Sequence, residues 1–166
     1  MKTIVLGGGC FWCLDAIYKK VEGVTNIESG YAGGNTDSPT YEEVCLGKTG
    51  HAEVVRLSFD ETKIDLKNIL RIFFEVHDPT TINAQGADIG TQYRSVIFYS
   101  NPEDEIVISS SIEEAQKNLK NKIVTEVSSL PSFYLAEEYH QDYYAKNPNQ
   151  PYCVAVISPK LEKFLK

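Results

Sequence analysis

Three consecutive glycines near the start of the chain constrain its fold more than any other feature. They occupy positions 7–9 and follow the apolar run of residues 3–6, which predicts a buried strand that ends at the glycines. Apolar residues then recur at the spacing of one helical face: Leu14, Ile17, Tyr18 and Val21. We therefore expect the chain to pass from a buried strand, through a turn that a ligand can approach closely, into a helix.

The rest of the chain predicts a mixture of strands and helices. Strands are expected within residues 25–31, 53–59, 93–99 and 122–127. Helices are expected to begin at Asp65 and after Asn101-Pro102, and a short one to lie within residues 136–145 of an otherwise irregular C-terminal segment. Because some strands follow one another without a helix between them, the pattern favours an α+β fold. This would be a two-layer sandwich around a mixed sheet with a ferredoxin-like (split βαβ) core, and a fully parallel, doubly wound sheet is the alternative.

Length and charge narrow the class of protein. The 166 residues fit a single domain spanning 1–166, and neither an internal repeat nor a linker divides them. The net charge of −7 and the lack of a basic cluster argue against a nucleic-acid surface. Because no apolar run is long enough for a membrane span or a signal-peptide core, we expect a cytoplasmic protein. We also expect it to be a monomer.

Cys10 directly follows the glycines, at the expected start of the helix. Unpaired N–H groups and the helix dipole at such a position favour a thiolate, the form in which cysteine acts as a nucleophile. Cys13 lies three residues further on, so both sulfurs are expected on one side of the first helical turn. Cys13 also extends the apolar stripe of the helix and could simply pack there, although a redox role is favoured. The cysteines are too few for a disulfide scaffold and lack the spacing of a zinc site.

Two further polar features are candidates for chemistry. Glu53 shares the alternate positions of the apolar residues in strand 53–59, so its carboxyl is expected to face the core. Burial would raise its pKa and keep it protonated near pH 7, whereas solvation at the open end of the strand is the equally weighted alternative. Asp88 and Tyr93 lie in the polar stretch of residues 77–95, which is typical of a binding loop and equally of a long surface loop.

A series of short motifs is spread over nearly the whole chain. They are Gly9-Cys10-Phe11-Trp12, Gly30-Tyr31-Ala32-Gly33-Gly34, Pro39-Thr40-Tyr41, Thr49-Gly50-His51-Ala52-Glu53, Gly90-Thr91-Gln92-Tyr93-Arg94-Ser95, Ala136-Glu137-Glu138-Tyr139-His140-Gln141 and Pro159-Lys160-Leu161. In this order they resemble the peptide methionine-S-sulfoxide reductase family of the A type. The resemblance implies an α+β sandwich without a metal or bound cofactor. It also implies methionine S-sulfoxide, free or in proteins, as the substrate, and thioredoxin as the reductant.

The same resemblance assigns roles in catalysis. Cys10 would attack the sulfoxide sulfur, and protonated Glu53 would donate a proton to the departing oxygen. The phenols of Tyr41 and Tyr93 would hydrogen-bond that oxygen as charge develops on it. Methionine would then leave, and Cys10 would remain as a sulfenic acid.

Substrate binding is assigned in the same way. Phe11 and Trp12 would hold the S-methyl group, because sulfur interacts favourably with aromatic rings. Asp88 would help to hold the substrate or the hydrogen-bond network of the site. Ala84 and Ala87 stand where larger polar residues are frequent in the family, which is expected to loosen contacts to the substrate or to neighbouring loops but not to alter the chemistry.

The identity of the second cysteine is open. Cys13 stands where the family often has glycine, and the chain ends at position 166 without the glycine-rich, cysteine-bearing tail of many relatives. We therefore expect Cys13 to form a disulfide with Cys10. Cys45, four residues after Tyr41, is the rival, and Cys153 is expected to be a buried filler in the strand-like segment 152–157.

Two other functions fit parts of the pattern. A thiol–disulfide oxidoreductase would use Cys10 and Cys13 as a dithiol pair and would reduce insulin disulfides without any sulfoxide. A peptide-binding or redox-sensing module would bind without turnover, and it leaves an acid at Glu53 unexplained.

Overall fold

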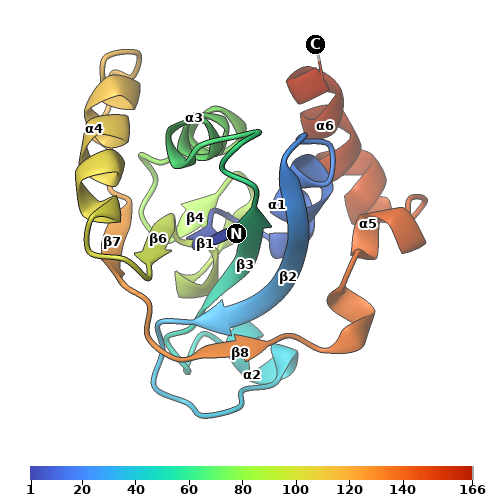
Figure 1. The fold of residues 1–166 in the computed structure, drawn as a ribbon. Helices are drawn as coiled ribbons and strands as arrows, with labels where there is room; N and C mark the ends of the chain where they lie inside the picture. The colour runs from blue at the N-terminus through green and yellow to red at the C-terminus, as the bar shows by residue number, and fades with distance from the viewer. Residues whose placement is uncertain (166) are drawn as a thin grey trace.

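A curled mixed sheet forms the centre of the fold in the computed structural model, which describes residues 1–165 (Figure 1). Its strands are β1 (Lys2–Gly7), β2 (Val24–Ala32), β3 (Ala52–Phe59), β6 (Val96–Tyr99), β7 (Glu126–Ser129) and β8 (Phe133–Leu135). They lie in the order β7-β6-β1-β3-β2-β8, and all neighbours are antiparallel except β6 and β7. The α+β expectation is confirmed, and the fully parallel alternative is wrong.

Two helices, α1 and α3, connect strands that are not neighbours in the sheet. The helix α1 (Phe11–Tyr18) joins β1 to β2, and β3 lies between these two parallel strands. The helix α3 (Leu66–Val76) follows β3 and leads towards β6, and β1 lies between β3 and β6. Two parallel strands with an antiparallel strand between them, joined by a helix, have the connectivity of a split βαβ unit.

Side chains alternate between two hydrophobic cores on opposite faces of the sheet. Ile4, Leu6 and Leu57 belong to the larger core, together with the buried residues of α1 and α3. Val5 and Val54 belong to the smaller core, which the segment around β8 helps to cover. Burial of each large side chain contributes on the order of 1.5–3 kcal/mol, so the sheet is held from both sides.

Capping residues set the positions of the helices that matter for the site. Asp65 accepts a hydrogen bond from the Asn68 N–H at 2.9 Å and begins α3, as predicted. Thr40 and Glu43 form a reciprocal capping box that begins the short helix α2 (Tyr41–Cys45). The helix α4 (Asp104–Gln116) follows Asn101-Pro102, as the sequence indicates.

Two predicted strands are displaced. The strand expected within 93–99 begins only at Val96, because residues Thr91–Tyr93 form a 3-10 turn, η1. The strand expected within 122–127 begins at Glu126 and continues to Ser129 as β7. Between α3 and η1 the chain forms a small hairpin of β4 (Ala84–Gln85) and β5 (Asp88–Ile89).

The C-terminal segment is more regular than predicted. It contains β8, the 3-10 turn η2 (Glu138–His140), α5 (Tyr143–Lys146), a π-helical turn η3 (Cys153–Ile157) and α6 (Ser158–Leu165). The predicted strand at 152–157 is therefore wrong. Cys153, Ile157 and Leu161 are buried at a spacing of four, which is the spacing of a helical face. Residues 153–157 are rich in β-branched side chains, which favour a strand, but packing against α1 overrides that preference. Within the described residues, no helix is both long and apolar enough to cross a membrane.

Candidate active site

Cys10 lies at the junction of β1 and α1, as the glycines predict. It is the N-cap residue of α1, with extended backbone angles, and its side chain is only 7 % exposed. Gly9, the residue before it, has φ = +90°, a conformation that favours glycine. A side chain at Gly8 would collide with the ring of His77, so the tight turn depends on both glycines.

Glu53 lies beside this turn and is fully buried. Its Oε1 accepts a hydrogen bond from the Phe11 N–H at 3.2 Å, in the first turn of α1. Its Oε2 has no partner within the described part of the chain. Burial raises the pKa of Glu53 to about 8, the Phe11 N–H opposes the shift, and the charge of Asp88 adds to it. Glu53 is therefore mostly protonated at pH 7.

The helix N-terminus was expected to favour a Cys10 thiolate, but in the folded protein burial has a larger effect in the opposite direction. Burial raises the pKa of the Cys10 thiol well above its usual value, and the charges of Glu53 and Cys13 raise it further. The Trp12 N–H acts in the opposite direction but is outweighed. Because Glu53 opposes ionisation of Cys10 only when it is charged, protonation of Glu53 favours the Cys10 thiolate.

Two phenols lie close enough to feel the charge of this pair. Burial, followed by the charge of Glu53, raises the pKa of both Tyr41 and Tyr93, so both are protonated donors. Tyr41 is the first residue of α2, and Tyr93 is in η1, where its carbonyl accepts a hydrogen bond from the Gly9 N–H at 3.2 Å. The fold thus brings Cys10 and Glu53 together with two hydroxyl groups from distant segments.

Aromatic side chains form one wall of the site. Phe11 is fully buried, whereas Trp12 is half-buried and stacks on Tyr143 with ring centroids 3.7 Å apart. The indole N–H of Trp12 donates to His140 Nδ1 at 3.0 Å. The His140 ring also lies 5.0 Å from that of Phe11 and 4.3 Å from that of Tyr41, measured between centroids.

Sequence reasoning gave no role to His140 or to Glu137. The carboxylate of Glu137 accepts hydrogen bonds from the Tyr31 hydroxyl at 2.8 Å and from the Tyr41 N–H at 2.9 Å. His140 is fully buried, and burial lowers its pKa, so it is neutral at pH 7. Both residues lie in the motif 136–141, but residue type alone did not indicate that they hold Tyr41 and Trp12 in place.

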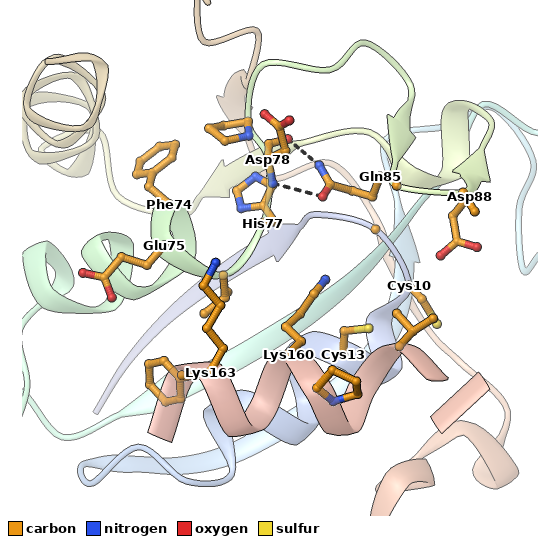
Figure 2. A pocket seen from close by; sticks show the side chains of 18 of the residues that line it. Cys10, Cys13, Phe74, Glu75, His77, Asp78, Gln85, Asp88, Lys160 and Lys163 are labelled. Atoms are coloured by element: carbon orange, nitrogen blue, oxygen red, sulfur yellow. Dashed lines mark hydrogen bonds between the residues drawn. The ribbon is translucent and has the colours of Figure 1, made fainter. Parts of the chain in front are cut away.

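Cys10 and Cys13 both line a cleft between the end of α3 and α6 (Figure 2). The cleft has a volume of about 1310 Å³, and Lys160 of α6 lines it as well. Tyr152 OH lies 3.9 Å from Cys13 Sγ and donates a hydrogen bond to Asp88 Oδ2 at 2.6 Å. Asp88 is therefore bonded to a partner of Cys13, a connection that sequence reasoning missed.

The two remaining cysteines differ in their environment. All four thiols are free in this structure. Cys45 is exposed, and its thiol forms a hydrogen bond with Tyr41 that lowers its pKa, although burial has the larger, opposite effect. Cys153 is fully buried in the larger core.

His77 has a structural role. It is buried, and its ring nitrogens contact the Phe73 carbonyl and the Ser95 hydroxyl. Burial lowers its pKa to about 4, so the ring is neutral at pH 7. Gln85 Oε1 accepts a hydrogen bond from the Asp78 N–H at 3.0 Å, a contact within the loop of residues 77–95 that joins its middle to the residue after His77.

The chain is similar to known proteins over nearly its whole length. The sequence model of the family described as peptide methionine sulfoxide reductase matches residues 2–166. Peptide methionine sulfoxide reductase MsrA of Paenarthrobacter aurescens is 58% identical over 163 residues, which cover 98% of this chain and 94% of that protein. The protein of the same name from Saccharolobus solfataricus is 52% identical over 166 residues, covering 100% of this chain and 94% of the relative.

Solved structures agree with these sequence matches. Mxr1 from Saccharomyces cerevisiae in its reduced form superposes with a TM-score of 0.87 and 41% identity, covering 92% of this chain and 88% of Mxr1. Mxr1 in complex with Trx2 gives a TM-score of 0.62 and 28% identity, with 86% of this chain and 84% of Mxr1 covered.

Proposed function

Because the chain belongs to the peptide methionine sulfoxide reductase family, we propose that it repairs oxidised proteins by reducing methionine sulfoxide and that thioredoxin supplies the electrons. The activity follows from the family and the reductant from the Mxr1–Trx2 complex, a related enzyme bound to such a partner. We further propose that it works as a single-domain monomer in the cytoplasm, where a reducing environment keeps thiols free.

The observation that carries the mechanism is the buried carboxyl beside Cys10. The Cys10 thiolate attacks the sulfoxide sulfur, and the sulfoxide oxygen must gain protons because hydroxide is a poor leaving group. Glu53 is suited to supply one, since its pKa is raised to about 8 by burial and its Oε2 has no protein partner in the described chain. The new bond between Cys10 Sγ and the methionine sulfur forms as the S–O bond breaks, and the oxygen departs as water. Water then adds to Cys10 Sγ and loses a proton while the S–S bond breaks and its electron pair leaves with methionine. The products of this half-reaction are methionine and a Cys10 sulfenic acid.

The surrounding groups position the substrate. The hydroxyls of Tyr41 and Tyr93 donate hydrogen bonds to the sulfoxide oxygen while negative charge develops on it. Trp12 offers the accessible aromatic face for the S-methyl group, and Phe11 supports it from the buried side. A site that fixes the methyl group, the oxygen and the peptide side through different residues accepts one hand of a chiral sulfur, and we assign the S epimer.

In the second half-reaction Cys13 attacks the Cys10 sulfenic acid and releases water. Residues three apart in a helical turn have Cα atoms about 5–5.5 Å apart, within the range that a disulfide tolerates. Both thiols line the same cleft, which also gives a reductant access to the disulfide. Cys153 is buried in the core, whereas Cys45 is exposed and hydrogen-bonded to Tyr41. Cys45 is therefore the rival of Cys13 as the cysteine that attacks the sulfenic acid.

The test is to treat the reduced enzyme with one equivalent of N-acetylmethionine S-sulfoxide, digest it without reductant and map the crosslinked peptide by mass spectrometry. We expect a Cys10–Cys13 disulfide in the parent and in the matched control Cys45→Ser. The variant Cys13→Ser should release one methionine, retain a sulfenic acid that dimedone traps, and lose thioredoxin-driven turnover. A crosslink from Cys10 to Cys45 or to Cys153 in the parent would overturn the assignment.

A further inference from the structure

The second thiol of the site has a chemical difficulty that the proposed function leaves unsolved. Cys13 is 2 % exposed, and burial raises the pKa of its thiol. A thiol is a weak nucleophile, so attack on a sulfenic acid requires removal of the Cys13 proton. Glu53 is unsuited to accept it, because it is mostly protonated at pH 7 and is placed beside Cys10.

A hydrogen-bonded chain leads from Cys13 to a carboxylate. Tyr152 OH lies 3.9 Å from Cys13 Sγ and donates its own proton to Asp88 Oδ2 at 2.6 Å. Because the phenol proton is already engaged with Asp88, the neutral Cys13 thiol must be the donor in its contact with the phenol oxygen. The two donors therefore point their protons in one direction, from the Cys13 sulfur to the Tyr152 phenol and from the phenol to the Asp88 carboxylate.

We infer that Tyr152 and Asp88 form a proton relay that activates Cys13 for disulfide formation. The inference rests on the proposed role of Cys13 as the resolving thiol. It makes Tyr152 a catalytic residue, because it touches the reacting sulfur, and Asp88 a positioning residue that acts through Tyr152. It also gives Asp88 a function in the second half-reaction, in addition to any contact with the sulfoxide.

The step balances without an external oxidant or reductant. The Cys13 proton passes to the Tyr152 oxygen as the Tyr152 proton passes to Asp88, and the new phenol proton then points back to the Cys13 thiolate. The thiolate forms the S–S bond with Cys10, the S–O bond of the sulfenic acid breaks, and the leaving hydroxide takes up one proton to become water. Asp88 also lines the cleft and can return its proton to solvent, so one proton is removed and one is consumed.

The charged and titratable groups around Cys13 agree with this direction of transfer. Lys160 lines the same cleft (Figure 2), and its positive charge, followed by the Tyr152 hydrogen bond, lowers the Cys13 pKa against the larger effect of burial. Negative charges on Asp88 and Glu53 raise the Cys13 pKa instead. The groups that face Cys13 are Cys10, Glu53, Asp88, Tyr152 and Lys160.

The experiment is a single turnover with saturating N-acetylmethionine S-sulfoxide, in which released methionine and dimedone-trapped sulfenic acid are quantified over time from pH 6 to 9. Tyr152→Phe should still release methionine, and its sulfenic acid should decay about 10- to 100-fold more slowly than in the parent at pH 7. The deficit should shrink as pH rises, because hydroxide can then deprotonate Cys13. Asp88→Asn should show the same pattern.

Tyr144→Phe is the matched control, because it removes a phenol from the same C-terminal segment whose hydroxyl lies 2.7 Å from Ser158 Oγ. It should leave the sulfenic acid lifetime unchanged. The relay would be refuted if the sulfenic acid of Tyr152→Phe decayed as fast as that of the parent. It would also be refuted if Asp88→Asn released methionine more slowly but its sulfenic acid decayed at the parent's rate. If Cys13→Ser still forms the Cys10 disulfide, the proposed role of Cys13 fails, and the relay fails with it. If Cys13→Ser loses the disulfide but the sulfenic acid of Tyr152→Phe decays at the parent's rate, the relay is refuted while the role of Cys13 stands.

Discussion

Replacing Glu53 with glutamine should lower activity and at the same time alter the pH dependence of stability. Glutamine keeps the shape of the side chain and can still accept the Phe11 N–H bond, but it carries no transferable proton. Loss of a general acid typically reduces the rate by a factor of about 10²–10⁴. We therefore expect Glu53→Gln to reduce methionine release by this factor at pH 7.

The effect on folding has the opposite sign. The pKa of Glu53 is raised from 4.5 to about 8 in the folded protein, so its contribution to stability is fully present below pH 4.5 and is lost as pH rises through 8. At pH 7, which is one unit below the folded pKa, the contribution of Glu53 to the free energy of unfolding of the parent is therefore lower by about 3 kcal/mol than at acid pH. Glu53→Gln removes this loss but leaves an amide N–H buried, which costs about 1–3 kcal/mol. The variant should thus be as stable as the parent at pH 7, or more stable by up to about 2 kcal/mol.

The assay combines initial rates with urea unfolding between pH 4.5 and 8, both under reducing conditions. The free energy of unfolding of Glu53→Gln relative to the parent should increase by about 3 kcal/mol from pH 4.5 to pH 7. Subtraction cancels the contributions of other titrating groups, such as Asp15, whose pKa burial raises to about 6. Iodoacetamide should alkylate Cys10 at least as fast in the variant, because the charge that raises its pKa is gone.

Glu28→Gln is the matched control, because it makes the same change on β2, where Glu28 forms a half-exposed ion pair with Arg56 at 2.8 Å. It should keep full activity and change stability by no more than about 1 kcal/mol. Activity of Glu53→Gln within threefold of the parent would refute the proton-donor role. An unchanged pH profile of stability would refute the raised pKa.

Three further expectations concern other parts of the molecule. Chiral chromatography of a racemic N-acetylmethionine sulfoxide reaction should show consumption of the S epimer alone, and equal loss of both epimers would contradict the assigned pocket. His140→Phe removes the acceptor of the Trp12 indole N–H. We therefore expect a higher KM with a smaller change in kcat, together with altered tryptophan fluorescence. Unchanged kinetics would show that this hydrogen bond does not position Trp12. Asp104→Asn breaks an ion pair at 2.6 Å between Lys2 and the Asp104 carboxylate, which is 1 % exposed. Urea unfolding should show a free energy of unfolding lower by about 2–4 kcal/mol, while the folded enzyme remains active. A decrease below about 1 kcal/mol would show that this pair behaves like a surface ion pair.

Local sequence signals predicted the parts of the fold that depend on neighbouring residues. The positive φ of Gly9 before Cys10 and the cap at Asp65 each depend on residues within a few positions, so residue type and spacing were sufficient. The alternation in residues 53–59 likewise predicted the buried face of β3, but for Glu53 itself solvation was an equally weighted alternative, and only the fold shows that Glu53 is buried. The C-terminal helix η3–α6 was missed because its first part, residues 153–157, is rich in β-branched residues, whose strand preference is overridden only when α1 is there to pack against.

Chemistry at the site depended on contacts that only the folded chain creates. The sequence placed Cys10 at a helix terminus, but the degree of burial around it, which raises its pKa, comes from segments throughout the chain. The Trp12–His140 bond joins residues 128 positions apart, and the Tyr152–Asp88 bond joins residues 64 positions apart. A pattern of residues therefore determined which groups can react, whereas the tertiary structure decided their proton affinities and partners, because desolvation and hydrogen bonding act through space rather than along the chain.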